Sequence, residues 1–223
     1  LAEYINCSSS DILLFPNPTT AINNLIKNLS LNKGDEVLMT QHEYGALVRA
    51  WDYASKMKKF KVVQKGIDMP LDSRQDFIDQ FLSGVNSKTK VIFMSHITSQ
   101  TALIFPVKEI CQYAKKSGIT TIVDGAHVPG HIKLDIEDID CDYYTGACHK
   151  WLCAPKGASF LFVGLYFITG FDLKKSFIKK VIMTVPAIMI NVFKLYLKNN
   201  FFSLSSFPEI YFSYFLSYSV CLL

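Results

Sequence analysis

Hydrophobic and polar positions follow two alternating patterns over residues 1–163. Short apolar, β-branched runs predict strands at Glu36–Thr40, Phe60–Gln64, Lys90–Met94, Thr120–Asp124 and Ser159–Val163. Between these runs, apolar residues recur every three or four positions, as in helices with one buried face. Strands that alternate with helices of this length predict an α/β fold, a sandwich in which helices cover both faces of a mostly parallel sheet.

Three helical stripes carry this interpretation. The first spans Thr20–Leu29, the second contains Leu47, Trp51 and Ala54, and the third runs from Val107 to Ala114. Gly118 predicts the end of the third helix. Ligands on such sheets bind beyond the carboxyl ends of the strands, so we look for candidate chemistry there.

The pattern changes from about residue 164 onward. No glycine follows Gly170, and 11 of the 52 residues from Asp172 are Phe or Tyr. A domain without glycine has difficulty forming its turns. We therefore interpret 164–223 as an atypical hydrophobic tail rich in Lys, Phe and Tyr, and not as a native domain. A membrane-associated tail is the alternative, but Pro186 and Asn191 interrupt its most apolar stretch, so a membrane partner is not expected.

Composition and charge exclude several classes of protein. Half of the 223 residues are hydrophobic and the mean hydropathy is +0.21, which excludes disorder of the whole chain. The formal charge of +4 comes from six lysines and two acids after residue 171, while 17 basic and 17 acidic residues balance before it. No nucleic-acid partner is expected from this balance. Six cysteines are too sparse for a disulfide framework and favour a cytoplasmic location, although a chain that starts at Leu1 leaves a targeting signal open.

Candidate chemistry gathers around a lysine and an acid. The strand Thr120–Asp124 leads into Asp124-Gly-Ala-His127, and Lys150, within Cys148-His149-Lys150-Trp151, follows 26 residues after the acid. A desolvated lysine forms a Schiff base with an aldehyde, and a buried acid holds a protonated ring nitrogen, which together suit pyridoxal phosphate. Thr19 and Thr20 begin a predicted helix, where free N–H groups favour a phosphate.

With these motifs the chain resembles the class V aminotransferase-like pyridoxal-phosphate enzymes, from about residue 4 to about residue 163. The resemblance rests on Asn17–Asn23, Asp124–His127 and His149–Gly157, and on a further segment that runs from Ser95 to Ser99. The form His149-Lys-Trp-Leu-Cys-Ala-Pro-Lys-Gly157 is most similar to the branch of isopenicillin-N-epimerase-like enzymes, cysteine desulfhydrases and sulfoxide lyases. It resembles the cysteine desulfurases proper less closely.

The resemblance implies a fold-type-I large domain, a pyridoxal 5'-phosphate cofactor and a role for each matching residue. Lys150 would bind the cofactor aldehyde and carry the α-proton of the substrate, and Asp124 would pair with the ring nitrogen. The remaining implied cofactor-binding residues are His127 and Ser99 at the phenolic oxygen, Thr19, Thr20 and His149 at the phosphate, and Tyr44 on the ring face.

The implied reaction is the removal of the Cα proton from a small amino-acid substrate. It would lead to epimerisation or to C–S bond cleavage at a cysteine-type substrate, with transamination less favoured, in a homodimer. Relatives continue into a small domain whose arginine grips the substrate carboxylate, and neither Arg49 nor Arg74 matches it. We therefore expect residues 1–163 to be a partial large domain, truncated at both ends. A non-catalytic fragment is the alternative.

Each candidate residue also has an ordinary structural interpretation. Asp124 could serve a turn, the two threonines could cap a helix, His127 could be a core histidine and Tyr44 could simply pack. A zinc site is another interpretation, because Cys141, Cys148, His149 and Cys153 are all potential ligands. Their spacing lacks the paired cysteines of structural zinc sites, so no metal is predicted.

Overall fold

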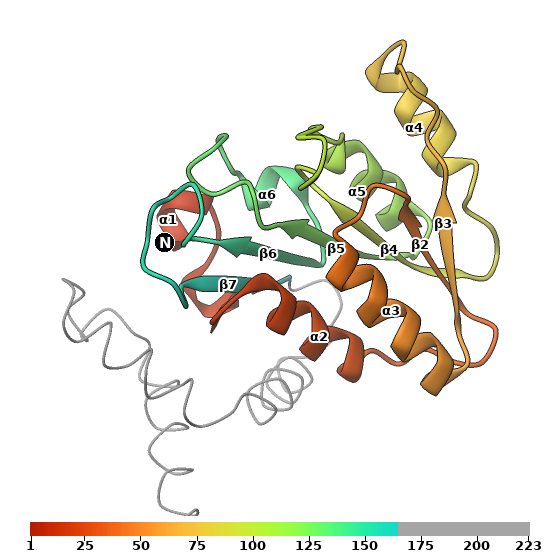
Figure 1. Cartoon of the computed structure of the whole chain (residues 1–223), viewed down its shortest axis with the longest axis horizontal. Coiled ribbons are helices and arrows are strands. Elements are labelled where there is room, and N and C mark those ends of the chain that lie inside the picture. Colours follow the sequence, from red (N-terminus) through yellow and green to blue (C-terminus); the bar gives the residue numbers. More distant parts are fainter. Residues whose placement is uncertain (165–223) are drawn as a thin grey trace, which may run out of the picture. The chain divides into compact units, whose positions relative to one another are not determined.

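A computed structural model describes residues 1–164, which form a seven-stranded sheet with helices on its faces (Figure 1). The strands lie in the order β1-β7-β6-β5-β4-β2-β3. Their bounds are β1 Ile12–Phe15, β2 Glu36–Thr40, β3 Lys61–Lys65, β4 Thr89–Ser95, β5 Thr120–Gly125, β6 Tyr143–Ala147 and β7 Ser159–Val163. Neighbours from β3 to β6 pair in parallel, whereas β7 is antiparallel to both β1 and β6. The predicted α/β class with a mostly parallel sheet is confirmed.

All five predicted strands are present. Strand β3 is displaced by one residue, β4 is longer by one residue at each end, and β5 is longer by one residue at its carboxyl end. The sequence patterns missed β1, which has four residues, and β6, whose Tyr-Tyr-Thr-Gly-Ala sequence contains a glycine in mid-strand. Glycine normally weakens a strand. Here Gly146 is required, because a Cβ atom at this position would lie 2.4 Å from the ring of Phe160 on β7.

The three predicted helices are also present, together with elements that the patterns did not reveal. The helices are α1 Ala2–Ile5, α2 Pro18–Asn28, α3 Gly45–Lys58, α4 Arg74–Leu82, α5 Val107–Lys116 and α6 Ile136–Ile139, with a 3₁₀ turn over Ser9–Asp11. Pro18 occupies the first turn of α2, where its missing N–H removes no helical hydrogen bond. Gly118 follows α5 with a φ of 65°, in the left-handed region that glycine enters without strain, as predicted for the end of this helix.

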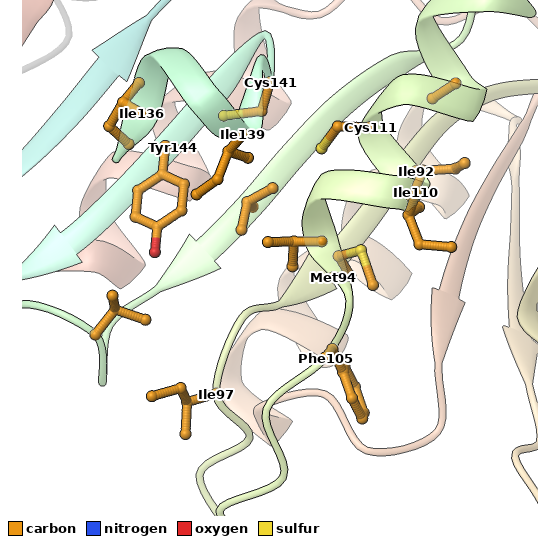
Figure 2. Packing of buried hydrophobic residues seen from close by; sticks show 14 of the residues in the cluster. Ile92, Met94, Ile97, Phe105, Ile110, Cys111, Ile136, Ile139, Cys141 and Tyr144 are labelled. Atoms are coloured by element: carbon orange, nitrogen blue, oxygen red, sulfur yellow. The ribbon is translucent and has the colours of Figure 1, made fainter. Parts of the chain in front are cut away.

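Strand β4 shows how the helices cover both faces of the sheet. Ile92 and Met94 point to the same face and join a buried cluster with Ile110 of α5 (Figure 2). Phe93, between them, points to the opposite face, where its ring lies 5.7 Å from that of Trp51 on α3. Successive side chains of a strand alternate between faces, so both faces of β4 are buried under helices. The predicted sandwich is confirmed.

The interpretation of 164–223 as an atypical tail lies outside the described residues, apart from Gly164. Within residues 1–164, no helix combines the length and the apolar character that crossing a membrane requires.

Candidate active site

The direction of the strands brings most of the predicted site residues to one edge of the sheet. Strands β1 and β6 are both antiparallel to β7, so they run in the same direction as β5. The carboxyl end of β5 carries Asp124, and that of β6 leads directly into His149 and Lys150. The carboxyl end of β1 leads into Thr19 and Thr20 at the start of α2. This is the edge at which α/β sheets bind ligands.

Asp124 is buried where β5 ends, with only 4% of its surface exposed. Its Oδ1 accepts a hydrogen bond from the backbone N–H of Ala126 at 3.0 Å. Its Oδ2 has no hydrogen-bond partner among residues 1–164. Burial raises the pKa of the Asp124 carboxyl to about 6, although the Ala126 N–H and the Lys150 charge act in the opposite direction. The structure thus holds a carboxyl group that has one oxygen to offer to a further donor.

Lys150, His127 and Trp151 form a connected group next to this carboxyl. Lys150 Nζ lies 3.0 Å from His127 Nε2, and the indole N–H of Trp151 donates to His127 Nδ1 at 3.2 Å. Both ring nitrogens of His127 are therefore engaged. The structure brings together Lys150, His127 and Asp124 from two separate sequence motifs.

Two effects act on the pKa of Lys150 in opposite directions. Partial burial lowers the pKa of Lys150, and the Asp124 carboxylate raises it, with burial the larger effect. Burial likewise lowers the pKa of His127, and the charges of Lys150 and His131 lower it further. A lysine with a lowered pKa presents more of the free amine that attacks an aldehyde near neutral pH.

The start of α2 is capped by Asn17. Its side-chain Oδ1 accepts the backbone N–H of Thr20 at 2.8 Å, so that N–H already has a partner. The hydroxyl groups of Thr19 and Thr20 donate or accept no hydrogen bond within residues 1–164. Both threonines are half-buried at a helix N-terminus, where the helix dipole favours an anion.

The three remaining predicted residues make no hydrogen bond to the lysine within residues 1–164. His149 precedes Lys150, but its Nδ1 lies 3.1 Å from the carbonyl oxygen of Ala158, so the loop backbone fixes this ring. Tyr44 is 45% exposed at the N-cap of α3. Ser99 is exposed in a turn after β4. No hydrogen bond within residues 1–164 joins any of the three to Lys150, His127 or Asp124.

Glu43 is a buried acid at the same edge that the sequence analysis did not single out. Its Oε1 accepts the Thr40 hydroxyl at 2.6 Å, and its Oε2 accepts the backbone N–H and the hydroxyl of Ser95 at 2.8 and 2.7 Å. Ser95 on β4 is the register partner of Asp124 on β5. Burial raises the pKa of Glu43 to about 7; those hydrogen bonds lower it, and the Asp124 charge raises it. The signal in the sequence was its place three residues after β2, next to Tyr44.

A buried pair, His96 and Tyr144, packs against the end of β5. His96 Nδ1 lies 2.9 Å from the hydroxyl of Tyr144, and burial lowers the pKa of His96 to about 4, so this ring is neutral. The Tyr144 ring lies so close to Gly125 that a Cβ atom there would meet it at 2.2 Å. His96 is thus a buried core residue.

The sequence offers four potential zinc ligands, Cys141, Cys148, His149 and Cys153. Within residues 1–164, no group of three or more His, Cys, Asp or Glu side chains is arranged to hold a metal ion.

Known proteins are similar to this chain in sequence and in fold. Residues 1–167 match the family described as "Aminotransferase class-V". Isopenicillin N epimerase of Streptomyces clavuligerus is 34% identical over 166 residues, which cover 72% of this chain and 40% of that protein. A protein described as "Probable L-cysteine desulfhydrase, chloroplastic" from Arabidopsis thaliana is 27% identical over 177 residues, covering 73% of this chain and 37% of that protein. The chain thus spans about two fifths of the length of the relatives it matches.

A solved structure shows the same fold. It is a complex of a cystine C-S lyase with its reaction product cysteine persulfide, and it matches with a TM-score of 0.67 at 23% sequence identity. The match covers 74% of this chain and 44% of the other.

Proposed function

This chain belongs to the aminotransferase class-V family, and from that premise we propose that residues 1–163 are the cofactor-binding part of a pyridoxal-phosphate enzyme that removes the α-proton of an amino acid. The observation that carries the proposal is the position of Lys150. Its amine lies beside His127 and close enough to buried Asp124 for the two charges to influence each other. A lysine for the aldehyde and an acid for the ring nitrogen are the two groups that this cofactor needs most.

The residues present fit the cofactor. Oδ2 of Asp124 has no partner within residues 1–164, which leaves an acceptor for a ring N–H. The hydroxyl groups of Thr19 and Thr20 at the start of α2 would hold the phosphate, together with His149. His127 and Ser99 would contact the phenolic oxygen, and Tyr44 would cover a ring face. When bound, pyridoxal phosphate supplies an aldehyde for lysine and a ring that takes up the electrons of the broken Cα–H bond.

Two residues of this chain would handle protons. The Asp124 carboxylate, at the end of β5, would keep the proton on the ring nitrogen, because a buried anion stabilises a neighbouring cation. Nζ of Lys150, once released by the substrate, would accept the Cα proton. Its lowered pKa keeps part of the amine unprotonated and able to accept that proton.

The proposed reaction class is epimerisation or C–S cleavage of a small amino acid, with transamination less favoured. The support is the likeness to isopenicillin N epimerase and to the protein described as an L-cysteine desulfhydrase. The homodimer and the cytoplasmic location stay predictions for the whole protein, as do the site roles of Ser99, His149 and Tyr44.

Adduct formation on Lys150 tests the proposal. The purified full chain is mixed with pyridoxal phosphate, its visible absorption is recorded, and borohydride is added before peptide mapping by mass spectrometry. We expect a reduced adduct on Lys150 in the wild type and in Lys156→Ala, which removes a second exposed lysine of the same loop. We expect none at this site in Lys150→Ala.

The outcomes separate binding from chemistry. Equal labelling of the Lys150→Ala variant would refute the cofactor assignment. An adduct on Lys150 whose absorption no amino acid perturbs would leave a cofactor-binding chain without the proposed amino-acid chemistry, which is the alternative of a non-catalytic fragment.

A further inference from the structure

We infer that Trp151 is a positioning residue whose indole N–H fixes the tautomer of His127 and thereby keeps Lys150 as a free amine. The inference rests on the proposed role of Lys150 as the residue that binds an aldehyde. It concerns the protein's own hydrogen bonds, however, and is visible in the chain without a cofactor.

The donors and acceptors of the three side chains leave one consistent arrangement. The indole nitrogen of Trp151 can only donate, so Nδ1 of His127, 3.2 Å away, must be the acceptor and carries no proton. A neutral imidazole then carries its proton on Nε2. That nitrogen faces Lys150 Nζ at 3.0 Å and becomes a donor toward the lysine.

A donor that faces an amine selects its uncharged form. The –NH₃⁺ group of a protonated lysine has three donors and no acceptor, whereas the free amine has a lone pair that accepts from Nε2–H. The arrangement that Trp151 imposes on His127 therefore favours unprotonated Lys150. Partial burial lowers the pKa of Lys150 in the same direction, independently of His127.

The loop that carries Trp151 is held in place by the close approach of two backbone segments, next to a ring contact. The Trp151 ring lies 4.7 Å from that of His131, measured between ring centroids. Gly130 has a φ of 81°, and a Cβ atom there would lie 2.6 Å from the carbonyl oxygen of Trp151. Only glycine permits this approach, so the turn over residues 126–131 packs directly against the backbone of the loop after β6. This backbone contact fixes the position of Trp151, and with it the direction of the indole N–H toward His127.

The other titratable groups around the three residues are few. Asp124 at the end of β5 favours charged Lys150, and His131 on the same turn as His127 disfavours a charged His127. Tyr4 of α1 reaches this turn, where its hydroxyl accepts the N–H of Gly130. His149, which precedes the lysine, is bound to the loop backbone. Among these groups, Trp151 is the one whose donor decides which nitrogen of His127 is protonated.

Nuclear magnetic resonance of ¹⁵N-labelled histidine measures the tautomer directly in the full chain without cofactor. The signal of His127 is assigned by its loss in His127→Gln. We expect Nε2 to be protonated in the wild type, and the tautomers to become mixed in Trp151→Phe, which keeps an aromatic ring and removes the N–H. In the matched control His131→Ala, which removes the packed ring and its contact with the backbone oxygen of His127 but keeps the indole N–H, the tautomer stays as in the wild type.

Competitive acetylation at neutral pH measures the consequence for Lys150, with exposed Lys56 of α3 as the internal reference for reagent. In Trp151→Phe, freed His127 can present an unprotonated Nε2 that accepts from charged lysine. Gaining one hydrogen bond to the charged form would slow acetylation of Lys150 by between about twofold and tenfold. Simple uncovering of the lysine would speed the reaction instead.

Three results would overturn the inference. They are protonated Nδ1 in the wild type, an unchanged tautomer in Trp151→Phe, or an equal change in His131→Ala. Acetylation of Lys150 that is as fast in Trp151→Phe as in the wild type, or faster, would refute the link to the lysine. If the tautomer and acetylation behave as expected but borohydride traps no cofactor on Lys150, the proposed function fails while the positioning role of Trp151 stands.

Discussion

Replacing Gly125 with alanine is expected to destabilise the fold at the point where β5 presents Asp124. A Cβ atom at Gly125 would lie 2.2 Å from both Cε1 and the hydroxyl oxygen of Tyr144. Tyr144 is fully buried, its ring stacks 6.4 Å from that of Phe160, and its hydroxyl is bonded to His96. The ring cannot yield without repacking the core or breaking this hydrogen bond.

Two contributions determine the expected loss of unfolding free energy in Gly125→Ala. Forcing an extra methyl group into a well-packed core costs about 1–3 kcal/mol. Leaving the buried His96 nitrogen without its partner costs about 1–3 kcal/mol more. Because the two responses share one side-chain movement, we expect the Gly125→Ala variant to lose about 2–5 kcal/mol of unfolding free energy.

Urea unfolding of the full chain, followed by circular dichroism, provides the assay. Gly45→Ala is the matched control, because its Cβ atom would lie at an ordinary 3.5 Å from Arg49 Nη1 at the first position of α3. Alanine is the better helix former, so this control is expected to be neutral or up to about 1 kcal/mol more stable. A Gly125→Ala variant as stable as its control would show that Tyr144 moves at little cost and would refute the reasoning.

Three further substitutions test the surroundings of the site by urea unfolding. Burial raises the pKa of Glu43 from 4.5 to about 7, so the wild type loses stability as that carboxyl ionises. The unfolding free energy of Glu43→Gln should therefore rise relative to that of the wild type by up to about 3 kcal/mol between about pH 4.5 and pH 7. A difference that does not depend on pH would contradict this. Tyr144→Phe leaves His96 without its partner and should cost about 1–3 kcal/mol, unlike a substitution of exposed Tyr53 by Phe. Asn17→Ala removes the side-chain cap of α2 and should cost about 1 kcal/mol, while Asn17→Asp, which keeps an acceptor, should not.

The sheet could be predicted where side-chain pattern and strand burial agree. Strands β2, β4, β5 and β7 consist largely of buried apolar or β-branched residues, and their sequences show it. Strand β6 is equally buried, but Gly146 stands in it because Phe160 of the neighbouring strand fills the space of a side chain. That requirement comes from a residue 14 positions away, so no local pattern could reveal it.

Part of the candidate site, too, could be predicted from the sequence, and part could not. The places of Asp124 and Lys150 follow from strand ends, because parallel neighbours such as β5 and β6 expose their carboxyl ends at one edge. Which nitrogen of His127 carries a proton depends instead on contacts made across the chain, by Trp151 to Nδ1 and by Lys150 to Nε2. The sequence gives the residue types directly, whereas the hydrogen-bond donor that faces the lysine amine depends on contacts between two loops. For that reason Trp151, which reads as part of a motif, takes on a distinct role only once the fold places it against His127.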